Sequence, residues 1–177
     1  MISNLGKLGL NLRTTLIAVS WIPVALTFNE NVCYVAKIEG KSMRPTLNPS
    51  DKTHTDWVLM WKWGAKNPAN LRHNDVVLFK SPSDPQRVYC KRIKGVQYDT
   101  IQTRHPYPRA IVTIPRSHIW TEGDNAFHST DSNEFGPVST GLVLGKAVAI
   151  VWPPSRWNSS LNQSVGRGDL SIKGSAI

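Results

Sequence analysis

Cysteine is scarce in this chain of 177 residues, which contains only Cys33 and Cys90. Two cysteines are too few for the disulfide framework of a small secreted domain, and they lack the paired spacing of a zinc site. We therefore expect no metal and no cofactor. Cys90 could pair with one of five histidines as a thiol nucleophile, but its neighbours carry no such motif, which favours a buried, unreactive thiol.

Acidic residues are also few, because twelve Asp and Glu stand against twenty-one Lys and Arg, for a net charge of +9. Such an excess can indicate attraction to nucleic acid or to an anionic membrane surface. The basic residues are spread from Lys7 to Lys173 without an arginine-rich or aromatic-interleaved stripe, so the pattern predicts no nucleic-acid binding. The apolar share of 40% is typical of a globular protein with one domain.

Long hydrophobic runs are absent apart from one near the N-terminus. Ser20 and Pro23 are the strong interruptions within residues 14–28. This run is shorter than the roughly 20 residues that cross a bilayer, so a spanning helix must extend on either side, and we place a candidate anchor at residues 12–31. A cleaved secretory signal and a buried soluble helix are the alternatives. No small-x-small cleavage site follows Phe28, which favours a retained anchor.

A sustained helical period is missing from the rest of the chain. Short runs rich in Val, Ile, Tyr and Trp alternate there with turn-forming stretches, which is typical of β proteins. The predicted strands lie within residues 33–39, 56–62, 75–80, 87–96, 110–114, 117–121 and 142–152. We therefore predict a mainly β fold, with an N-terminal membrane helix in segment 1–32, an antiparallel β domain over residues 33–157, and a flexible tail over 158–177.

Three polar segments of the β domain contain the candidates for chemistry. The first, residues 40–47 (GKSMRPTL), places Ser42 in a turn that bears proline. The second, residues 87–95 (RVYCKRIKG), places Lys91 in a strand. The third, residues 122–139, concentrates carboxylates and hydroxyls between glycines. Each is ordinary by itself, because serine is common in turns and a strand lysine is usually solvated.

The direction of the Lys91 side chain decides whether this lysine can act as a base. Alternation along the strand places Lys91 and Tyr89 on one face, and Cys90 and Arg92 on the other. With a free pKa of ~10.4, only about one lysine in ~2500 is neutral at pH 7, so the pKa of a lysine base must fall by roughly 2 to 3. Desolvation in a β core can lower it by this amount.

Together the segments resemble type I signal peptidases. That family has a Ser-Met-x-Pro-Thr turn, an aspartate-led strand, a Lys-Arg strand, and a Gly-Asp-Asn loop that ends in Ser-x-Asp-Ser. The four occur here in the same order at Ser42–Leu47, Asp75–Phe79, Lys91–Arg92 and Gly123–Ser132. The resemblance covers residues 33–152. It implies a membrane-bound serine endopeptidase with a signal-peptidase-like antiparallel β domain and a catalytic Ser/Lys pair.

The same resemblance implies a role for individual residues. Ser42 corresponds to the nucleophile and Lys91 to the general base. Ser129 corresponds to a hydroxyl that orients the lysine, and Asp131 to a carboxylate that braces the loop. Acyl transfer would follow, in which the serine attacks the scissile carbonyl and the lysine removes its proton.

Two positions near these residues differ from the bacterial pattern. Asn133 stands where bacterial relatives usually have arginine, and Gly40 stands where many have a serine that donates to the oxyanion. Gly40 and Met43 are therefore expected only to support the nucleophile turn. The oxyanion hole would depend on backbone N–H groups, with those of Ser42 and one neighbour as the first candidates, or on water.

Residues 131–139 (DSNEFGPVS) and 152–157 (WPPSRW) resemble the mitochondrial inner membrane peptidases of the subunit 2 type. This narrower resemblance implies a single-pass protein of the mitochondrial inner membrane, with its catalytic domain facing the intermembrane space. It also implies precursor proteins as substrates, from which N-terminal sorting segments are removed, a paralogous peptidase subunit as partner in a hetero-oligomer, and membrane lipid around the anchor.

The substrate and the membrane each have candidate contact residues. An extended substrate segment is expected to lie along an exposed strand, with residues 33–38 and 75–79 as walls of a shallow apolar pocket. Trp57, Trp61 and Trp63 are candidates for the membrane interface, although core packing or partner contact is the usual role of tryptophan.

Two other functions are compatible with parts of the sequence. A non-catalytic anchor or scaffold subunit would keep the fold, but it would not need Ser42 and Lys91 together. A self-cleaving DNA-binding repressor of the LexA type shares the Ser/Lys chemistry and the β fold, and it would explain the positive charge. It needs an N-terminal helix-turn-helix, however, for which residues 1–32 are too short and too apolar.

Overall fold

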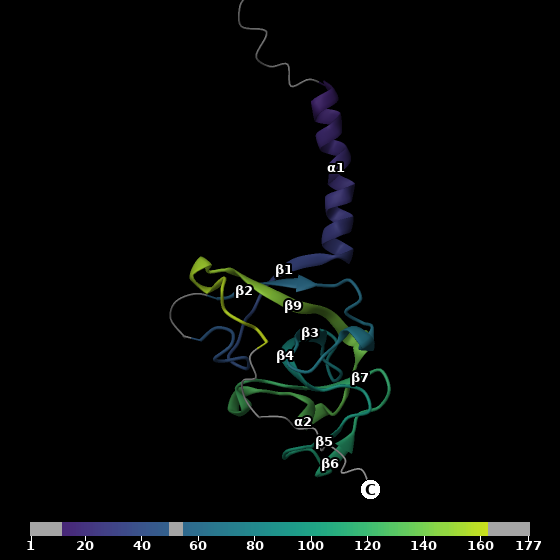
Figure 1. Ribbon diagram of the computed structural model, residues 1–177, viewed down its shortest axis with the longest axis vertical. Coiled ribbons are helices and arrows are strands. Elements are labelled where there is room, and N and C mark those ends of the chain that lie inside the picture. Colours follow the sequence, from purple (N-terminus) through teal and green to yellow (C-terminus); the bar gives the residue numbers. More distant parts are fainter. Residues whose placement is uncertain (1–11, 50–54, 163–177) are drawn as a thin grey trace, which may run out of the picture.

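The computed structural model describes residues 12–49 and 55–162, which form a long helix followed by a β domain (Figure 1). The helix is α1 (Leu12–Asn31). The strands are β1 (Cys33–Lys37), β2 (Trp57–Trp61), β3 (Val76–Lys80), β4 (Val88–Gly95), β5 (Thr100–Gln102), β6 (Ile111–Thr113), β7 (His118–Glu122), β8 (Val138–Ser139) and β9 (Val143–Trp152). A short helix, α2 (Ser132–Phe135), precedes β8, and 3₁₀ turns lie at Pro68–Asn70, Ala126–His128, Thr140–Leu142 and Pro154–Arg156.

The main sheet has seven strands in the order β1-β2-β9-β3-β4-β7-β8. All neighbouring strands are antiparallel, and β5 and β6 form a separate hairpin. The prediction of a mainly antiparallel β fold is therefore confirmed. The predicted runs contain most of the strands, whereas β5 and β8 were not predicted.

Hydrophobic cores lie on both faces of the central strand β3. Val76 and Leu78 belong to the core on one face, while Val77 and Phe79 belong to the core on the other. This arrangement explains why the sequence of β3 is apolar at successive positions rather than alternating. Strand β4 lies next to β3, and its residues 91–95 are buried whichever face they point to, whereas Val88 at its start is exposed.

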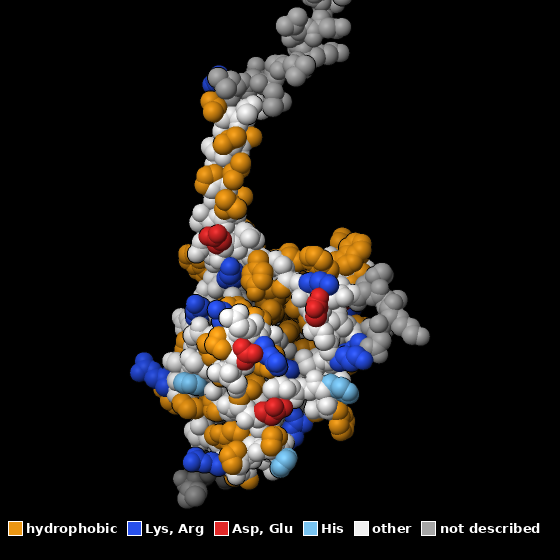
Figure 2. Space-filling view, turned by 180° about the vertical axis from the view of Figure 1, so that it is seen from behind, with side chains coloured by type: hydrophobic (Ala, Val, Ile, Leu, Met, Phe, Trp, Pro, Cys, Tyr) orange, Lys and Arg blue, Asp and Glu red, His pale blue; other side chains and the backbone are white. Residues whose placement is uncertain are grey.

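Helix α1 projects from the β domain, so most of its apolar side chains are exposed (Figure 1). The helix joins the domain at its C-terminal end, where Lys62 N–H donates to the Val32 carbonyl at 2.7 Å. Eight large apolar residues of α1 are each 52–64% exposed: Leu16, Ile17, Val19, Trp21, Ile22, Val24, Leu26 and Phe28. Figure 2 shows hydrophobic side chains along this projecting helix.

The same residues that were predicted as an anchor thus form a helix. None of the helices within residues 12–49 and 55–162 combines the length and the mean hydropathy expected of a segment that crosses a bilayer. The membrane role of residues 12–31 stays a prediction.

Packing extends beyond residue 157, where the β domain was expected to end. Leu161 is buried in the same core as Met43 and Val76. Its carbonyl oxygen accepts a hydrogen bond from Nη1 of the buried Arg92 at 2.6 Å. A single apolar residue in a polar stretch has no periodic signal, which explains why the sequence did not indicate this contact. The rest of the expected tail, residues 163–177, lies outside the described residues.

We expect Leu161→Ala to lower the free energy of unfolding by about 2 to 4 kcal/mol, because it removes a buried side chain and leaves a cavity. Denaturation of the full-length protein in detergent is the measurement. The control is Ser160→Ala at the exposed neighbouring position, which should change stability by less than about 0.5 kcal/mol. Equal stability of the two variants would show that residue 161 is not part of the folded domain.

Candidate active site

Ser42 lies in the turn that follows β1. The neighbouring Met43 and the later Leu47 are buried in the core, and Leu47 N–H donates to the Met43 carbonyl at 2.8 Å. These two buried side chains hold the turn against the sheet, while Ser42 stays partly exposed. Gly40, at the start of the turn, is exposed and has a φ of +97°, which glycine adopts without the strain that a side chain would add.

Lys91 lies in the middle of β4 and is only 2% exposed. Its Nζ donates to Ser129 Oγ at 2.9 Å and lies 5.5 Å from the centre of the Tyr89 ring. The two side chains thus share a face, as alternation predicts. Burial lowers the pKa of Lys91 below that of free lysine, and the nearby Asp131 carboxylate offsets only part of this effect. A neutral amine is therefore accessible at lower pH than in free lysine.

A chain of hydrogen bonds continues from Lys91 through Ser129 to Asp131. Ser129 Oγ donates to Asp131 Oδ2 at 2.9 Å, and the N–H of Gly123 donates to the same oxygen at 3.2 Å. The other oxygen, Oδ1, accepts from the backbone N–H and the side-chain Nδ2 of Asn133, at 3.1 and 3.0 Å. Asn133 thus braces Asp131 with amide hydrogen bonds instead of an arginine salt bridge.

Gly123 allows the loop of residues 123–131, which contains Ser129 and Asp131, to lie against the turn that carries Ser42. A Cβ on Gly123 would lie 2.7 Å from the carbonyl oxygen of Ser42 and closer still to Ser129 Oγ, so only glycine permits this approach. Asn125 N–H donates to the same Ser42 carbonyl at 2.9 Å. The hydrogen bonds of the described residues join Lys91 Nζ to Ser129 Oγ and do not join it to Ser42 Oγ.

Beside this chain lies a buried ion pair that the sequence did not predict. Arg92 Nε donates to Asp124 Oδ1 at 2.8 Å and Arg92 Nη2 to Oδ2 at 2.7 Å, and both side chains are 0% exposed. Thr46, from the turn that carries Ser42, contacts both members of the pair. Alternation along the strand correctly placed Arg92 on the face opposite Lys91. It could not identify Asp124 as the partner, because no local pattern connects residues that are 32 positions apart. The pair fastens the turn and the loop to β4.

Cys90 is a poor candidate for a nucleophile. Its thiol is free, as is that of Cys33. Burial raises the pKa of Cys90 to about 12, so the thiol is neutral at physiological pH, whereas the reactive form is the thiolate. The prediction of an unreactive thiol agrees with this environment. Cys90 packs instead against one hydrophobic core, together with Tyr34 and Ala36 of β1, where one wall of the substrate pocket was predicted.

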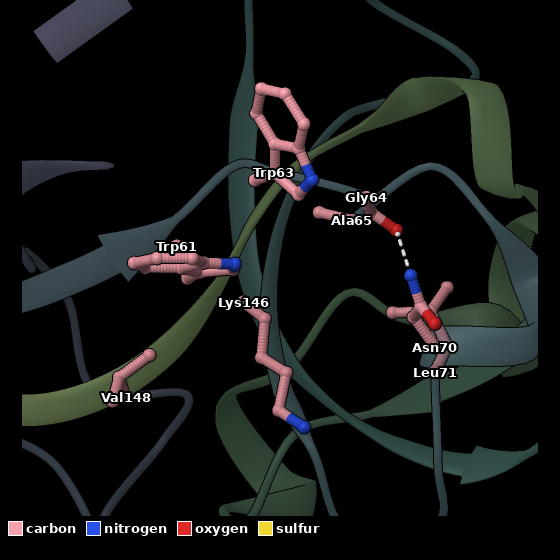
Figure 3. Close-up of a pocket in the computed structure, with 8 residues that line it drawn as sticks. All are labelled: Trp61, Trp63, Gly64, Ala65, Asn70, Leu71, Lys146 and Val148. Atoms are coloured by element: carbon pink, nitrogen blue, oxygen red, sulfur yellow. Dashed lines mark hydrogen bonds between the residues drawn. The ribbon is translucent and has the colours of Figure 1, made fainter. Parts of the chain in front are cut away.

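A separate cavity of about 460 Å³ contains none of the predicted catalytic residues (Figure 3). Its lining consists of Trp61, Trp63, Gly64, Ala65, Asn70, Leu71, Lys146 and Val148. Figure 3 shows the Lys146 side chain running away from Trp63, and its Nζ pairs with Asp75 Oδ1 at 2.8 Å. The remaining lining is mainly apolar.

Comparisons with known proteins agree on one family. The family model described as "Signal peptidase, peptidase S26" matches residues 11–107 and 102–152. The mitochondrial inner membrane protease subunit 2 of Saccharomyces cerevisiae is 60% identical over 161 residues, covering 90% of this chain and 91% of the relative. Subunit 1 of the same protease from Schizosaccharomyces pombe is 38% identical over 133 residues, covering 75% of this chain and 82% of that relative.

Among solved structures, a signal peptidase I from Enterococcus faecalis matches with a TM-score of 0.39 and 20% identity, covering 45% of this chain and 97% of that chain. The family model spans most of the sequence, and the first relative is similar along nearly its whole length. This chain therefore belongs to the signal peptidase family, peptidase S26, and is a serine endopeptidase.

Proposed function

We propose that the protein removes N-terminal sorting segments from precursor proteins, with Ser42 as nucleophile and Lys91 as general base. The observation that carries this proposal is the buried Lys91 amine, which a chain of hydrogen bonds through Ser129 connects to Asp131. The loop that supplies Ser129 contacts the backbone of Ser42. A base, the group that orients it and a nucleophile turn thus meet at one loop, as acyl transfer requires.

The proposed reaction begins with the neutral Lys91 amine, which burial favours. Ser42 Oγ attacks the scissile carbonyl while its proton passes to Lys91 Nζ. Backbone N–H groups of the turn then bind the oxyanion. As the peptide bond breaks, Lys91 returns the proton to the leaving amine, and an acyl group remains on Ser42. Water, activated in turn by Lys91, hydrolyses this ester. Asp131 holds Ser129 in place throughout.

We further propose that the protein resides in the mitochondrial inner membrane, with its catalytic domain in the intermembrane space and a paralogous subunit as partner. The names of the relatives support this location, because both are subunits of a mitochondrial inner membrane protease. They also support the hetero-oligomer, because the two numbered subunits are both similar to this chain. Precursor proteins that carry a sorting segment are the proposed substrates.

The exposed apolar surface of α1 supports a membrane role for this helix. Apolar side chains such as Ile17 and Val24 are more than half exposed, and lipid would cover them. An apolar depression of about 420 Å³ lies between α1 and Trp63, and Trp63 also lines the cavity of Figure 3. Tryptophan is enriched where a protein meets the membrane surface. We therefore place Trp61 and Trp63 at this surface.

We expect the double variant Val19→Asp, Val24→Asp to be released from mitochondrial membranes by alkaline extraction, whereas the parent stays in the pellet. A carboxylate near the centre of a spanning helix costs roughly 2.5 to 3.5 kcal/mol for insertion. Asn29→Asp, at the end of α1 that joins the β domain, is the control and should remain with the membrane. Retention of the double variant would contradict the proposed anchor.

The experiment that tests the proposed function traps the acyl-enzyme. The full-length protein is mixed with a precursor peptide, quenched in acid, and analysed by mass spectrometry. We expect the N-terminal part of the peptide as an ester on Ser42 and the C-terminal part as free product. Ser42→Ala should produce neither. If the folded parent produces neither product nor adduct with its partner subunit present, the non-catalytic scaffold function replaces this proposal.

A further inference from the structure

Asn125 holds two consecutive carbonyls of the turn that carries Ser42. Its backbone N–H donates to the carbonyl of Ser42 at 2.9 Å, and its side-chain Nδ2 donates to the carbonyl of Lys41 at 3.2 Å. The Lys41 carbonyl also accepts from Arg44 N–H at 3.3 Å, within the turn itself. Both carbonyls are thus directed toward the loop that follows Gly123.

These bonds determine the direction of two N–H groups. In a trans peptide, the carbonyl of one residue and the N–H of the next point in opposite directions. Because the carbonyls of Lys41 and Ser42 face Asn125, the N–H groups of Ser42 and Met43 face away from it. Neither donates a hydrogen bond to any residue within 12–49 or 55–162. Such N–H groups at the start of a turn can bind an anion.

The identity of residue 40 makes these N–H groups important. Gly40 has no hydroxyl to offer an oxyanion, and a Cβ at this position would meet nothing within 4 Å. Stabilisation of the tetrahedral intermediate therefore depends on donors of the backbone, whose direction must be fixed before the reaction begins. A peptide that rotates by a few tens of degrees no longer points its N–H at the oxyanion.

We propose that Asn125 is the positioning residue of the oxyanion hole. Its hydrogen bonds to Lys41 and Ser42 hold the N–H groups of Ser42 and Met43 in the direction of the developing oxyanion. The side-chain bond to Lys41 is the part that a substitution can remove, since the backbone bond to Ser42 is kept in any variant. This inference rests on the proposed role of Ser42 as nucleophile.

The test compares Asn125→Ala and Asn125→Leu with the parent, all as full-length protein in detergent. Asn70→Ala is the matched control, because Asn70 Nδ2 also donates to a backbone carbonyl, that of Gly64, at 3.1 Å, in a loop outside the active site (Figure 3). The readouts are kcat, KM, the pH profile, and the affinity for two inhibitors that share the sequence of the substrate.

The two inhibitors distinguish binding of the oxyanion from binding of the peptide chain in the ground state. With a peptide aldehyde, Ser42 Oγ forms a bond to the aldehyde carbon, the C=O double bond opens to an oxyanion, and the hydroxyl proton passes to Lys91. The corresponding peptide alcohol cannot form this adduct, so its affinity reports only the binding of the peptide chain. A residue that directs the oxyanion donors therefore changes the affinity for the aldehyde and leaves the affinity for the alcohol unchanged.

We expect both Asn125 variants to lower kcat by about 10- to 100-fold, somewhat less than the loss of a donor itself, with KM within about twofold of the parent. The affinity for the aldehyde should fall by the same factor as kcat/KM, while that for the alcohol stays unchanged. The apparent pKa of the pH profile should also stay unchanged, since Asn125 bonds to Lys41 and Ser42 and not to Lys91. Ser129→Ala, which removes the Lys91 hydrogen bond, should change it.

Several results would overturn the inference. It fails if both Asn125 variants keep kcat within about threefold of the parent, or if kcat falls without a matching loss of aldehyde affinity. It also fails if Asn70→Ala has the same effect. Should Asn125→Ala not fold, Asn125→Leu decides, because leucine is similar in size and removes the donor without adding a charge. Activity retained in Ser42→Ala would instead contradict the nucleophile itself, which is a separate outcome.

Discussion

Lys91→Arg is expected to lower kcat/KM by about 10²- to 10⁴-fold, the usual contribution of general acid–base catalysis. Arginine preserves the positive charge but keeps its proton at any usable pH, so it cannot accept one from Ser42. Cleavage of a precursor peptide by the full-length protein is the measurement. Lys80→Arg is the matched control, because Lys80 is an exposed lysine on the adjacent strand, and it should keep full activity.

The pH profile of the parent adds a second check on the same residue. Because burial lowers the pKa of Lys91, activity should rise with pH through an apparent pKa below that of free lysine. If Lys91→Arg keeps more than about a tenth of the parent activity, the lysine base is wrong. If a single histidine variant folds but is inactive, a histidine base must replace it.

Stability measurements on Lys91→Met can test the lowered pKa of Lys91 independently of catalysis. The pKa of Lys91 is lower in the folded state, so the unfolded chain binds more protons between this pKa and 10.5. The free energy of unfolding of the parent therefore gains a contribution that rises with pH in this window. Lys91→Met lacks this contribution, so any stability gain of the variant should be largest at low pH and shrink as the pH approaches 10.5.

The fold was predictable from the sequence where strands are long and apolar. The run at residues 75–80 became β3, with one residue fewer, and the run at 142–152 became β9. The short strands β5 and β8 were missed because two or three residues show no clear alternation. They depend on pairing with β6 and β7, which only the folded chain provides.

In the candidate active site, too, local features could be predicted and contacts between distant segments could not. Alternation within one strand was enough to place Lys91 beside Tyr89, because it depends on local backbone geometry. Family resemblance pointed to Ser129, and the structure joins it to Lys91. The partnership of Arg92 with Asp124 and the burial of Leu161 were not predicted. Both join segments that are distant in sequence, and no periodic pattern in either segment identifies its partner.

Disruption of the buried Arg92–Asp124 pair should have the largest effect on stability. Both side chains are 0% exposed. Asp124→Ala therefore leaves a buried guanidinium without its carboxylate, and Arg92→Met leaves a buried carboxylate without its guanidinium. Removing one partner of such a pair costs about 3 to 5 kcal/mol. Activity should fall as well, because the pair holds Thr46 and with it the turn of Ser42. Chemical denaturation in detergent is the measurement.

Arg87→Met is the matched control for this prediction. Arg87 Nε lies 3.1 Å from Asp84 Oδ2, but these side chains are 69% and 44% exposed, and such surface pairs contribute about 0 to 1 kcal/mol. The double variant Arg92→Met, Asp124→Ala should lose less stability than the sum of the two single variants, because no unpaired charge remains.

The double variant should still be less stable than the parent. Arg92 Nη1 also donates to the carbonyls of Asn74 and Leu161, at 2.8 and 2.6 Å. Methionine leaves both without this donor, which costs about 1 to 3 kcal/mol for the buried Leu161 carbonyl and less for the partly buried Asn74 carbonyl. A buried arginine that binds two segments of main chain is thus not replaceable by an apolar side chain of similar size. Equal stability of Arg92→Met and Arg87→Met would contradict this view of the pair, because it would mean that neither the ion pair nor the two carbonyl contacts contributes to the folded state.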